Sequence, residues 1–265
     1  MAGTAGRRST PTWGCVAASS ASPKRWFRNT GDDSRAVFVD HGFGPAHGGS
    51  SGRVNEVRRG RDAASLAALR KADPVIAALI DANPDYDPDA WLAELPKMDP
   101  FGVLIFQVIG QQLSVAVTRV MLGRLLDRFG GHLPSPEELL AADPEDIRAV
   151  GLSHRKVETL RDLAERFVDG RLDPAELARL PDEDVVARLT EVSGVGRWTA
   201  EGFLAIALHR DDVVLPGDLA LRKAIQRAYT LDHLPSQSEV LAIAEAWRPH
   251  RSLAVNYLFA SVYRA

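Results

Sequence analysis

Hydrophobic residues recur with a helical period from about residue 62 onward. Leu66, Leu69, Ile76 and Ile80 follow the three- and four-residue spacing of amphipathic helices, and prolines divide the pattern into short segments. No segment alternates apolar and polar residues as a half-buried strand does. The pattern therefore predicts an all-α fold made of many short helices.

The longest apolar stretch covers residues 101–130. It predicts a mostly buried helix that is interrupted near Gly110, followed by a second helix that stops at Gly130 and Gly131. Later segments place proline at or near the first helical position and acidic residues in the first turn: LPSPEE, AADPED, RLDPAEL and RLPDEDV. They predict further short helices.

The first 60 residues have a different composition. They are rich in Gly, Ser, Arg and Pro and have no sustained apolar period, which is typical of a segment that cannot bury enough surface to fold. We therefore expect a disordered tail over residues 1–60 and one folded domain over residues 61–265.

Charge is unevenly distributed between these two parts. The tail has 9 Lys and Arg against 4 Asp and Glu, whereas residues 61–265 have 23 against 31. Bulk charge would not predict that so acidic a domain binds nucleic acid. Contact with DNA would need a local basic surface or backbone amides.

A single cysteine, Cys15, excludes a disulfide framework and any zinc or iron-sulfur site built from clustered thiolates of this chain. No HxxxH pair occurs, so we expect no metal site made of histidines. Because no run of 18 apolar residues and no leader-like segment is found, we expect a cytoplasmic protein without a membrane partner.

The most specific segment is LTEVSGVGRWTAEGFLAIAL, residues 189–208. Gly194 and Gly196 separate two predicted helices, about 182–191 and 197–208, which predicts a tight helical hairpin. Backbone N–H groups at such a turn can bind a phosphate without Lys or Arg. The alternative is a plain helix-helix turn.

A second segment, DDVVLPGDLALRKAI, covers residues 211–225. Pro216 and Gly217 predict a turn, and Asp218 stands at the start of the next helix. There its carboxylate would accept backbone N–H bonds and is expected to stay ionised at neutral pH. The alternative is that Asp218 is only a helix cap.

Four blocks in sequence order carry a family resemblance: VIGQQLSVAV (108–117), GVGRWTA (194–200), VVLPGDLALRKA (213–224) and AWRPHRSLAVNYLF (246–259). With them, residues 70–262 resemble the DNA-3-methyladenine glycosylase II branch of the helix-hairpin-helix DNA glycosylases. The resemblance implies a fold of two helical lobes with a cleft between them.

Roles follow from the resemblance residue by residue. Asp218 matches the catalytic aspartate. Gly194, Val195 and Gly196 match the hairpin amides that hold a DNA phosphate, and Arg197 follows them directly. A monovalent cation at the hairpin backbone, at Val192 and Gly194, is implied for part of the family, and no other cofactor is expected.

Position 198 distinguishes two subclasses. Family members that also cleave the DNA backbone use a lysine nucleophile there, which forms a Schiff base with the sugar. This chain has Trp198 instead. The resemblance therefore implies a monofunctional glycosylase without lyase activity.

Aromatic rings would recognise a flat, electron-poor base by stacking. Trp198, Phe259 and Tyr257 are the candidates for the base pocket, and Phe203 and Trp247 are further aromatics in the blocks; each has a core position as its alternative. Some relatives carry an aromatic ring where this chain has Gly202, one turn into the second hairpin helix.

The QQLS segment, residues 111–114, resembles the family loop that fills the gap left by a flipped base. Gln112 or Leu113 would be the wedge, and the sequence leaves that choice open. The alternative is a buried polar kink in a helix. Further basic residues near the blocks could bind phosphates: Arg155, Lys156, Arg222, Lys223, Arg248 and Arg251.

These inferences predict a monofunctional DNA N-glycosylase that flips out and excises alkylated purines, such as 3-methyladenine, in base excision repair. Its expected partner is double-stranded DNA with damaged bases, bound by a monomer in the cytoplasm at the nucleoid. Two alternatives remain. One is a non-catalytic hairpin protein that binds DNA, and the other is a glycosylase of the same fold for deaminated or oxidised bases.

Overall fold

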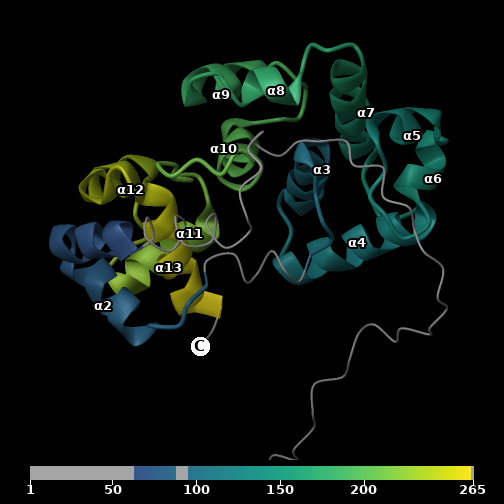
Figure 1. Ribbon diagram of the computed structural model, residues 1–265. Helices are drawn as coiled ribbons and strands as arrows, with labels where there is room; N and C mark the ends of the chain where they lie inside the picture. Colours follow the sequence, from purple (N-terminus) through teal and green to yellow (C-terminus); the bar gives the residue numbers. More distant parts are fainter. Residues whose placement is uncertain (1–62, 88–94, 264–265) are drawn as a thin grey trace, which may run out of the picture. The chain divides into compact units, whose positions relative to one another are not determined.

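The computed structural model describes residues 63–87 and 95–263, and these residues form helices and turns without a β-strand (Figure 1). The predicted tail, residues 1–60, lies outside the described residues. A first helical segment covers residues 63–72. The elements that follow are α2 (Pro74–Ala82), α3 (Pro100–Gly110), α4 (Val115–Arg128), α5 (Pro136–Ala141), α6 (Pro144–Arg148), α7 (His154–Val168), α8 (Pro174–Leu177), α9 (Asp182–Thr190), α10 (Arg197–Ile206), α11 (Leu219–Ala228), α12 (Gln237–Ala244), η2 (Glu245–Trp247) and α13 (Arg251–Tyr263). The all-α prediction is confirmed for the described part of the chain.

Prolines and small polar caps set the helix starts as the sequence predicts. Pro136, Pro144 and Pro174 are the first residues of α5, α6 and α8, and Pro181 immediately precedes α9. Proline suits this position because its missing N–H would have no partner inside the helix. The apolar stretch divides into α3 and α4, and the backbone turns with positive φ at Gly130 after α4.

Buried side chains form two hydrophobic cores. The first core is built from helices α3 to α10, and Leu104, Leu160 and Phe203 are among its fully buried members. The second is built from residue Leu69, α2, α11, α12, η2 and α13. In Figure 1, α2, α11, α12 and α13 lie together, and α10 lies between them and α3. The two cores correspond to the two helical lobes that the sequence predicts.

The segment before α11 contributes to both cores. Val213 is buried in the first core and its neighbour Val214 in the second. Leu215 packs against both cores. Asp218, three residues further on, is consequently positioned where the two cores meet.

One buried carboxylate anchors the second core. Asp73 caps α2 through the N–H groups of Val75 and Ile76, and its other oxygen accepts hydrogen bonds from the Tyr229 hydroxyl and from the Trp247 indole, at 2.9 Å for the indole. Burial opposes ionisation of Asp73, but these hydrogen bonds hold its pKa below the usual value. Trp247 is therefore a core residue, which corrects its candidacy for the base pocket.

Candidate active site

Asp218 is the N-cap of α11, and its two carboxylate oxygens have different partners. Oδ1 accepts the backbone N–H of Leu221 at 2.8 Å, and Oδ2 accepts the indole N–H of Trp198 at 2.8 Å. The first contact is an ordinary cap. The second comes from α10, which contributes to the first hydrophobic core, and is a contact that a helix cap does not require.

Trp198 reaches this position from the first turn of α10. Its side chain is half-buried, and its N–H group joins α10 to the start of α11 across 20 residues of sequence. Since both Asp218 oxygens are occupied by fixed donors, the orientation of the carboxylate is set before any ligand arrives. The structure thus brings together the predicted catalytic residue and one predicted pocket residue.

The turn between α9 and α10 requires glycine at one position only. Gly194 has φ of 89°, and a Cβ atom there would collide with the Thr159 hydroxyl of α7. At Gly196 a Cβ atom would meet nothing within 4 Å. The protein itself therefore leaves Gly196 open on its outer side, where a ligand could approach the backbone.

The start of α10 is uncapped by any side chain of the described residues. The first N–H groups of a helix have no partner inside it, and they carry the positive end of the helix dipole. Gly196 and Arg197, which begin this helix, are both exposed. This uncapped start of α10 therefore lies at the surface, at the place where the sequence predicts phosphate binding.

The QQLS turn lies against the hairpin. Gln111 donates its side-chain amide to the carbonyl of Gly194 at 2.9 Å and to the hydroxyl of Thr199 at 3.0 Å. Next to it, Gln112 has φ of 60° and is exposed, as is Leu113. The segment is an exposed turn between α3 and α4, which corrects the alternative of a buried kink.

The sequence analysis did not predict that Gln111 links the QQLS turn to the hairpin. Both Gln112 and Leu113 remain candidates for the wedge, since both side chains face solvent. The separation of 83 positions between Gln111 and Gly194 leaves no local signal for their contact.

Lys156 supports the same turn from α7. Its Nζ donates to the carbonyl oxygens of Ile109 and Gln111, at 2.8 and 3.0 Å, at the C-terminal end of α3. Burial lowers the pKa of this lysine. The ammonium group of Lys156 therefore already binds two carbonyl oxygens of the protein. This corrects the expectation that Lys156 binds a phosphate.

Arg197 is engaged with two carboxylates. It pairs with Glu183 of α9 at 2.6 Å and with Glu201, one turn further along α10, at 2.9 Å. Glu201 is buried, and desolvation raises its pKa to about 7. This buried glutamate has no counterpart among the residues singled out from the sequence, and it neutralises part of the charge that Arg197 would offer to a phosphate.

The other basic candidates divide into paired and unpaired groups. Arg248 and Arg251 share Asp212, and Arg222 donates to the Pro235 carbonyl. Within the described residues, the exposed side chains of Arg155 and Lys223 have no hydrogen-bond or ion-pair partner.

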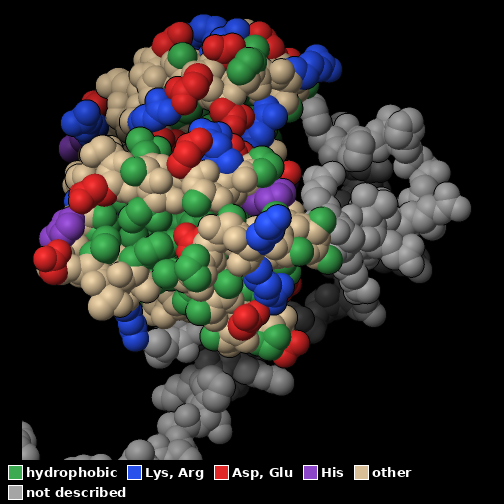
Figure 2. Space-filling view, turned by 90° about the vertical axis from the view of Figure 1, so that its left-hand side faces the viewer, with side chains coloured by type: hydrophobic (Ala, Val, Ile, Leu, Met, Phe, Trp, Pro, Cys, Tyr) green, Lys and Arg blue, Asp and Glu red, His purple; other side chains and the backbone are tan. Residues whose placement is uncertain are grey.

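Arg155 adjoins the hairpin because its carbonyl and that of Ser193 both lie 2.9 Å from the Thr159 hydroxyl. Lys and Arg are interspersed with Asp and Glu on the face seen in Figure 2, so no continuous basic surface appears there.

The aromatic candidates occupy different environments. Phe203 is fully buried in the first core, and Tyr257 is 2% exposed in the second core, with its ring 4.9 Å from that of Tyr86. Tyr257 and Phe203 are therefore core residues, which corrects their candidacy for stacking on a base. Phe259 is partly buried against the second core and Trp198 is half-buried, so these two remain candidates for the pocket.

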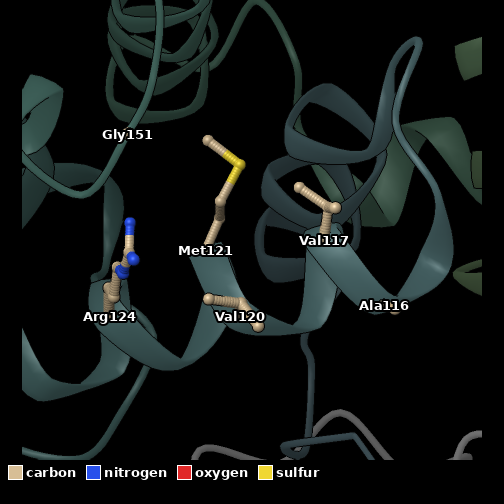
Figure 3. Close-up of a pocket in the computed structure, with 6 residues that line it drawn as sticks. All are labelled: Ala116, Val117, Val120, Met121, Arg124 and Gly151. Atoms are coloured by element: carbon tan, nitrogen blue, oxygen red, sulfur yellow. The ribbon is translucent and has the colours of Figure 1, made fainter.

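A hollow of about 400 Å³ on α4 is separate from these residues (Figure 3). Its lining is Ala116, Val117, Val120, Met121, Arg124 and Gly151. It contains none of the predicted site residues, and its one charged group, Arg124, donates to the Val150 carbonyl. The hollow offers no acid, base or nucleophile for catalysis.

Within residues 63–87 and 95–263, no three His, Cys, Asp or Glu residues are grouped as metal ligands, and no helix has the length and apolar character needed to cross a membrane. At the hairpin, the Val192 carbonyl accepts the Val195 N–H and the Gly194 carbonyl accepts the Gln111 amide. Each carbonyl keeps a second lone pair.

Known proteins share this arrangement of helices. DNA-3-methyladenine glycosylase 1 of Schizosaccharomyces pombe is 35% identical over 167 residues, which cover 62% of this chain and 73% of that protein. DNA-3-methyladenine glycosylase 2 of Escherichia coli is 27% identical over 174 residues, 61% of this chain and 57% of that protein. The structure of S. pombe 3-methyladenine DNA glycosylase in complex with abasic DNA matches with a TM-score of 0.70 and 31% identity, over 75% of this chain and 96% of that one.

The fold is that of the helix-hairpin-helix DNA glycosylases. Residues 105–249 match the family described as HhH-GPD superfamily base excision DNA repair protein. Because this match covers more than half of the sequence, the chain belongs to the HhH-GPD superfamily. The resemblance predicted from the four sequence blocks is confirmed.

Proposed function

We propose that this protein is a monofunctional DNA N-glycosylase that excises alkylated purines such as 3-methyladenine from duplex DNA in base excision repair. The observation that carries the proposal is the contact between Trp198 and Asp218, next to a hairpin with open backbone amides. A carboxylate with fixed orientation is the group that hydrolysis of an N-glycosidic bond needs, and position 198 has no amine to attack the sugar.

The substrate supplies much of the driving force. An alkylated purine such as 3-methyladenine is positively charged in DNA, so the base can leave as a neutral molecule with the electron pair of the N-glycosidic bond. No general acid is required. Extrusion from the duplex costs a few kcal/mol and is cheapest for a damaged base, which favours the lesion over normal bases.

Asp218 would act on the sugar. As the bond to the base breaks, positive charge develops on C1′ and the ring oxygen, and the carboxylate stabilises this oxocarbenium-like state. A water molecule then forms the new bond to C1′ and gives up a proton, which Asp218 can accept. The products are the free base and an abasic site with an intact DNA backbone.

The hairpin would hold the DNA beside the lesion. The amides at Gly196 and at the start of α10 would bind a phosphate, and a monovalent cation on the carbonyls of Val192 and Gly194 would add positive charge there. Arg155 adjoins this turn, and its exposed side chain has no partner in the described part of the chain, so it would add a basic group beside the phosphate. We further propose that a cytoplasmic monomer acts on the DNA.

Release of free base from methylated duplex DNA by the purified full chain tests the proposal. The expected result is release of methylated purines, with strand breaks only after hot alkali cleaves the abasic sites. Strand breaks without alkali would contradict the monofunctional assignment. DNA binding without release from any damaged duplex would leave a non-catalytic hairpin protein, and release of only uracil, hypoxanthine or oxidised bases would indicate another substrate class.

A further inference from the structure

Gly202 lies one turn after Trp198 on α10, and the space over it is filled by a side chain from α3. A Cβ atom built on Gly202 would lie 2.6 Å from Cδ and 2.8 Å from Oε1 of Gln107. These separations are too short for real contacts, so the Gln107 amide lies directly over the glycine. Any larger residue at position 202 would displace it.

The amide of Gln107 has no hydrogen-bond partner within the described residues, although the side chain is only 5% exposed. Buried side-chain amides normally have partners. Gln111, the residue that follows α3, provides the contrast, because its amide donates to Gly194 and Thr199. One glutamine in α3 and one directly after it thus approach the hairpin and α10, and the amide of Gln107 is unsatisfied.

The unsatisfied amide is not wholly enclosed. Arg210 Nε, which forms an ion pair with Asp182, is the one wholly enclosed side-chain nitrogen or oxygen of the described residues without a hydrogen bond, so the Gln107 amide atoms keep some exposed surface. That surface is where a ligand would meet the amide. A hydrogen bond from that ligand would satisfy a group that the protein leaves unpaired.

The position of Gly202 on α10 relates this amide to Trp198. At about 100° per residue, Gly202 lies about 40° around the helix from Trp198 and about 60° from Thr199. Trp198 contacts Asp218, and Thr199 contacts Gln111, which directly follows α3. The Gln107 amide therefore lies against a residue that is four positions along α10, about 6 Å of helix rise, from Trp198, which orients Asp218.

We infer that Gln107 is a specificity-determining residue whose amide hydrogen-bonds the edge of the extruded base. This inference rests on the proposed function. A glutamine amide pairs with adenine by accepting from the N6 amino group and donating to N7. In 3-methyladenine both groups are free, whereas 7-methylguanine carries its methyl group on N7 and has a carbonyl at C6. Gln107 should therefore favour N3-alkylated adenine over N7-alkylated guanine.

The test compares the two bases in one substrate. Methylated duplex DNA contains both lesions, and chromatography of the released bases gives two single-turnover rates per variant. Gln107→Leu keeps the approximate size of the side chain and removes the amide. We expect the rate for 3-methyladenine to fall about 10- to 100-fold and the rate for 7-methylguanine to change much less. The matched control is Gln226→Leu, at a half-buried glutamine of α11.

Gly202→Ala tests the geometry independently. Its methyl group would displace the amide, so the ratio of the two rates should shift as in Gln107→Leu. In a Gln107→Ala background, adding Gly202→Ala should change the ratio no further, because no amide remains to be displaced.

An unchanged ratio in Gln107→Leu, with an active wild type, would overturn this inference and leave the proposed function standing. Equal losses for both bases would also overturn it, because they indicate a structural role. A wild type that releases neither base would overturn both.

Discussion

Trp198 and Asp218 are joined by a hydrogen bond of 2.8 Å between the indole N–H and Oδ2. The bond connects the first turn of α10, in the first core, to the first residue before α11, in the second. It occurs at the position where lyase members of the family have their nucleophile, so the residue that replaces the lysine also orients the catalytic candidate. Trp198 therefore accounts for two features of the site: position 198 has no lysine nucleophile, and the carboxylate of Asp218 has a fixed orientation.

Trp198→Phe tests this relationship. The variant keeps an aromatic ring but loses the donor to Asp218, so the carboxylate gains rotational freedom. A hydrogen bond to a charged group contributes about 1.5–3 kcal/mol, which predicts a fall of about 10- to 150-fold in the single-turnover rate of base release. Affinity for DNA should change little, as measured by fluorescence anisotropy. A wild-type rate in Trp198→Phe would show that the contact has no catalytic consequence.

Alanine substitutions at the two hairpin glycines should separate folding from binding. Gly194→Ala forces a side chain into positive φ and against Thr159, so we expect the free energy of unfolding to fall by about 1–3 kcal/mol. Gly196→Ala should change it by less than about 0.5 kcal/mol, because the added methyl group meets no protein atom.

Both variants should lower DNA affinity. The methyl group of Gly196→Ala faces the expected phosphate, and Gly194→Ala distorts the turn that positions the backbone amides. Urea unfolding and DNA titration distinguish these effects. If Gly196→Ala binds DNA as well as the wild type, the phosphate does not approach the hairpin at this glycine.

Glu201 predicts a specific pH dependence of stability. Desolvation raises its pKa from 4.5 to about 7, against the opposing effect of Arg197. Between these values the folded state keeps a proton that the unfolded state has lost, so stability falls as pH rises through this window. The contribution is at most about 3 kcal/mol.

The measurement is urea unfolding of wild type and Glu201→Gln at pH 5 and pH 8. The difference in unfolding free energy between the two proteins should shift in favour of Glu201→Gln at pH 8. Glu158→Gln, at an exposed position of α7, is the control and should show no such shift. A difference that is independent of pH would contradict the raised pKa.

Local sequence signals were sufficient for the helices and for two parts of the site. Glycine spacing predicted the hairpin turn at Gly194, and the Pro216 and Gly217 turn predicted that Asp218 starts a helix. Both depend on backbone conformations that few residues adopt, so they can be read from neighbouring residues alone.

Contacts between distant segments could not be predicted in this way. The Gln107 amide over Gly202, the Gln111 bond to Gly194 and the Lys156 bonds to the end of α3 join residues far apart in sequence. A lysine or glutamine in a sequence does not indicate which partner the fold will bring to it. The same limit applied to the aromatic residues, because core and pocket positions have the same helical spacing.

Asp218→Asn, assayed for single-turnover release of 3-methyladenine alongside DNA affinity, tests the central claim most directly. Asparagine still caps α11, so the protein should fold and bind methylated DNA as before. Loss of the carboxylate should lower the rate by about 10² to 10⁴, the usual contribution of such a group. A folded Asp218→Asn protein that releases the base at the wild-type rate would reduce Asp218 to a helix cap and contradict the mechanism.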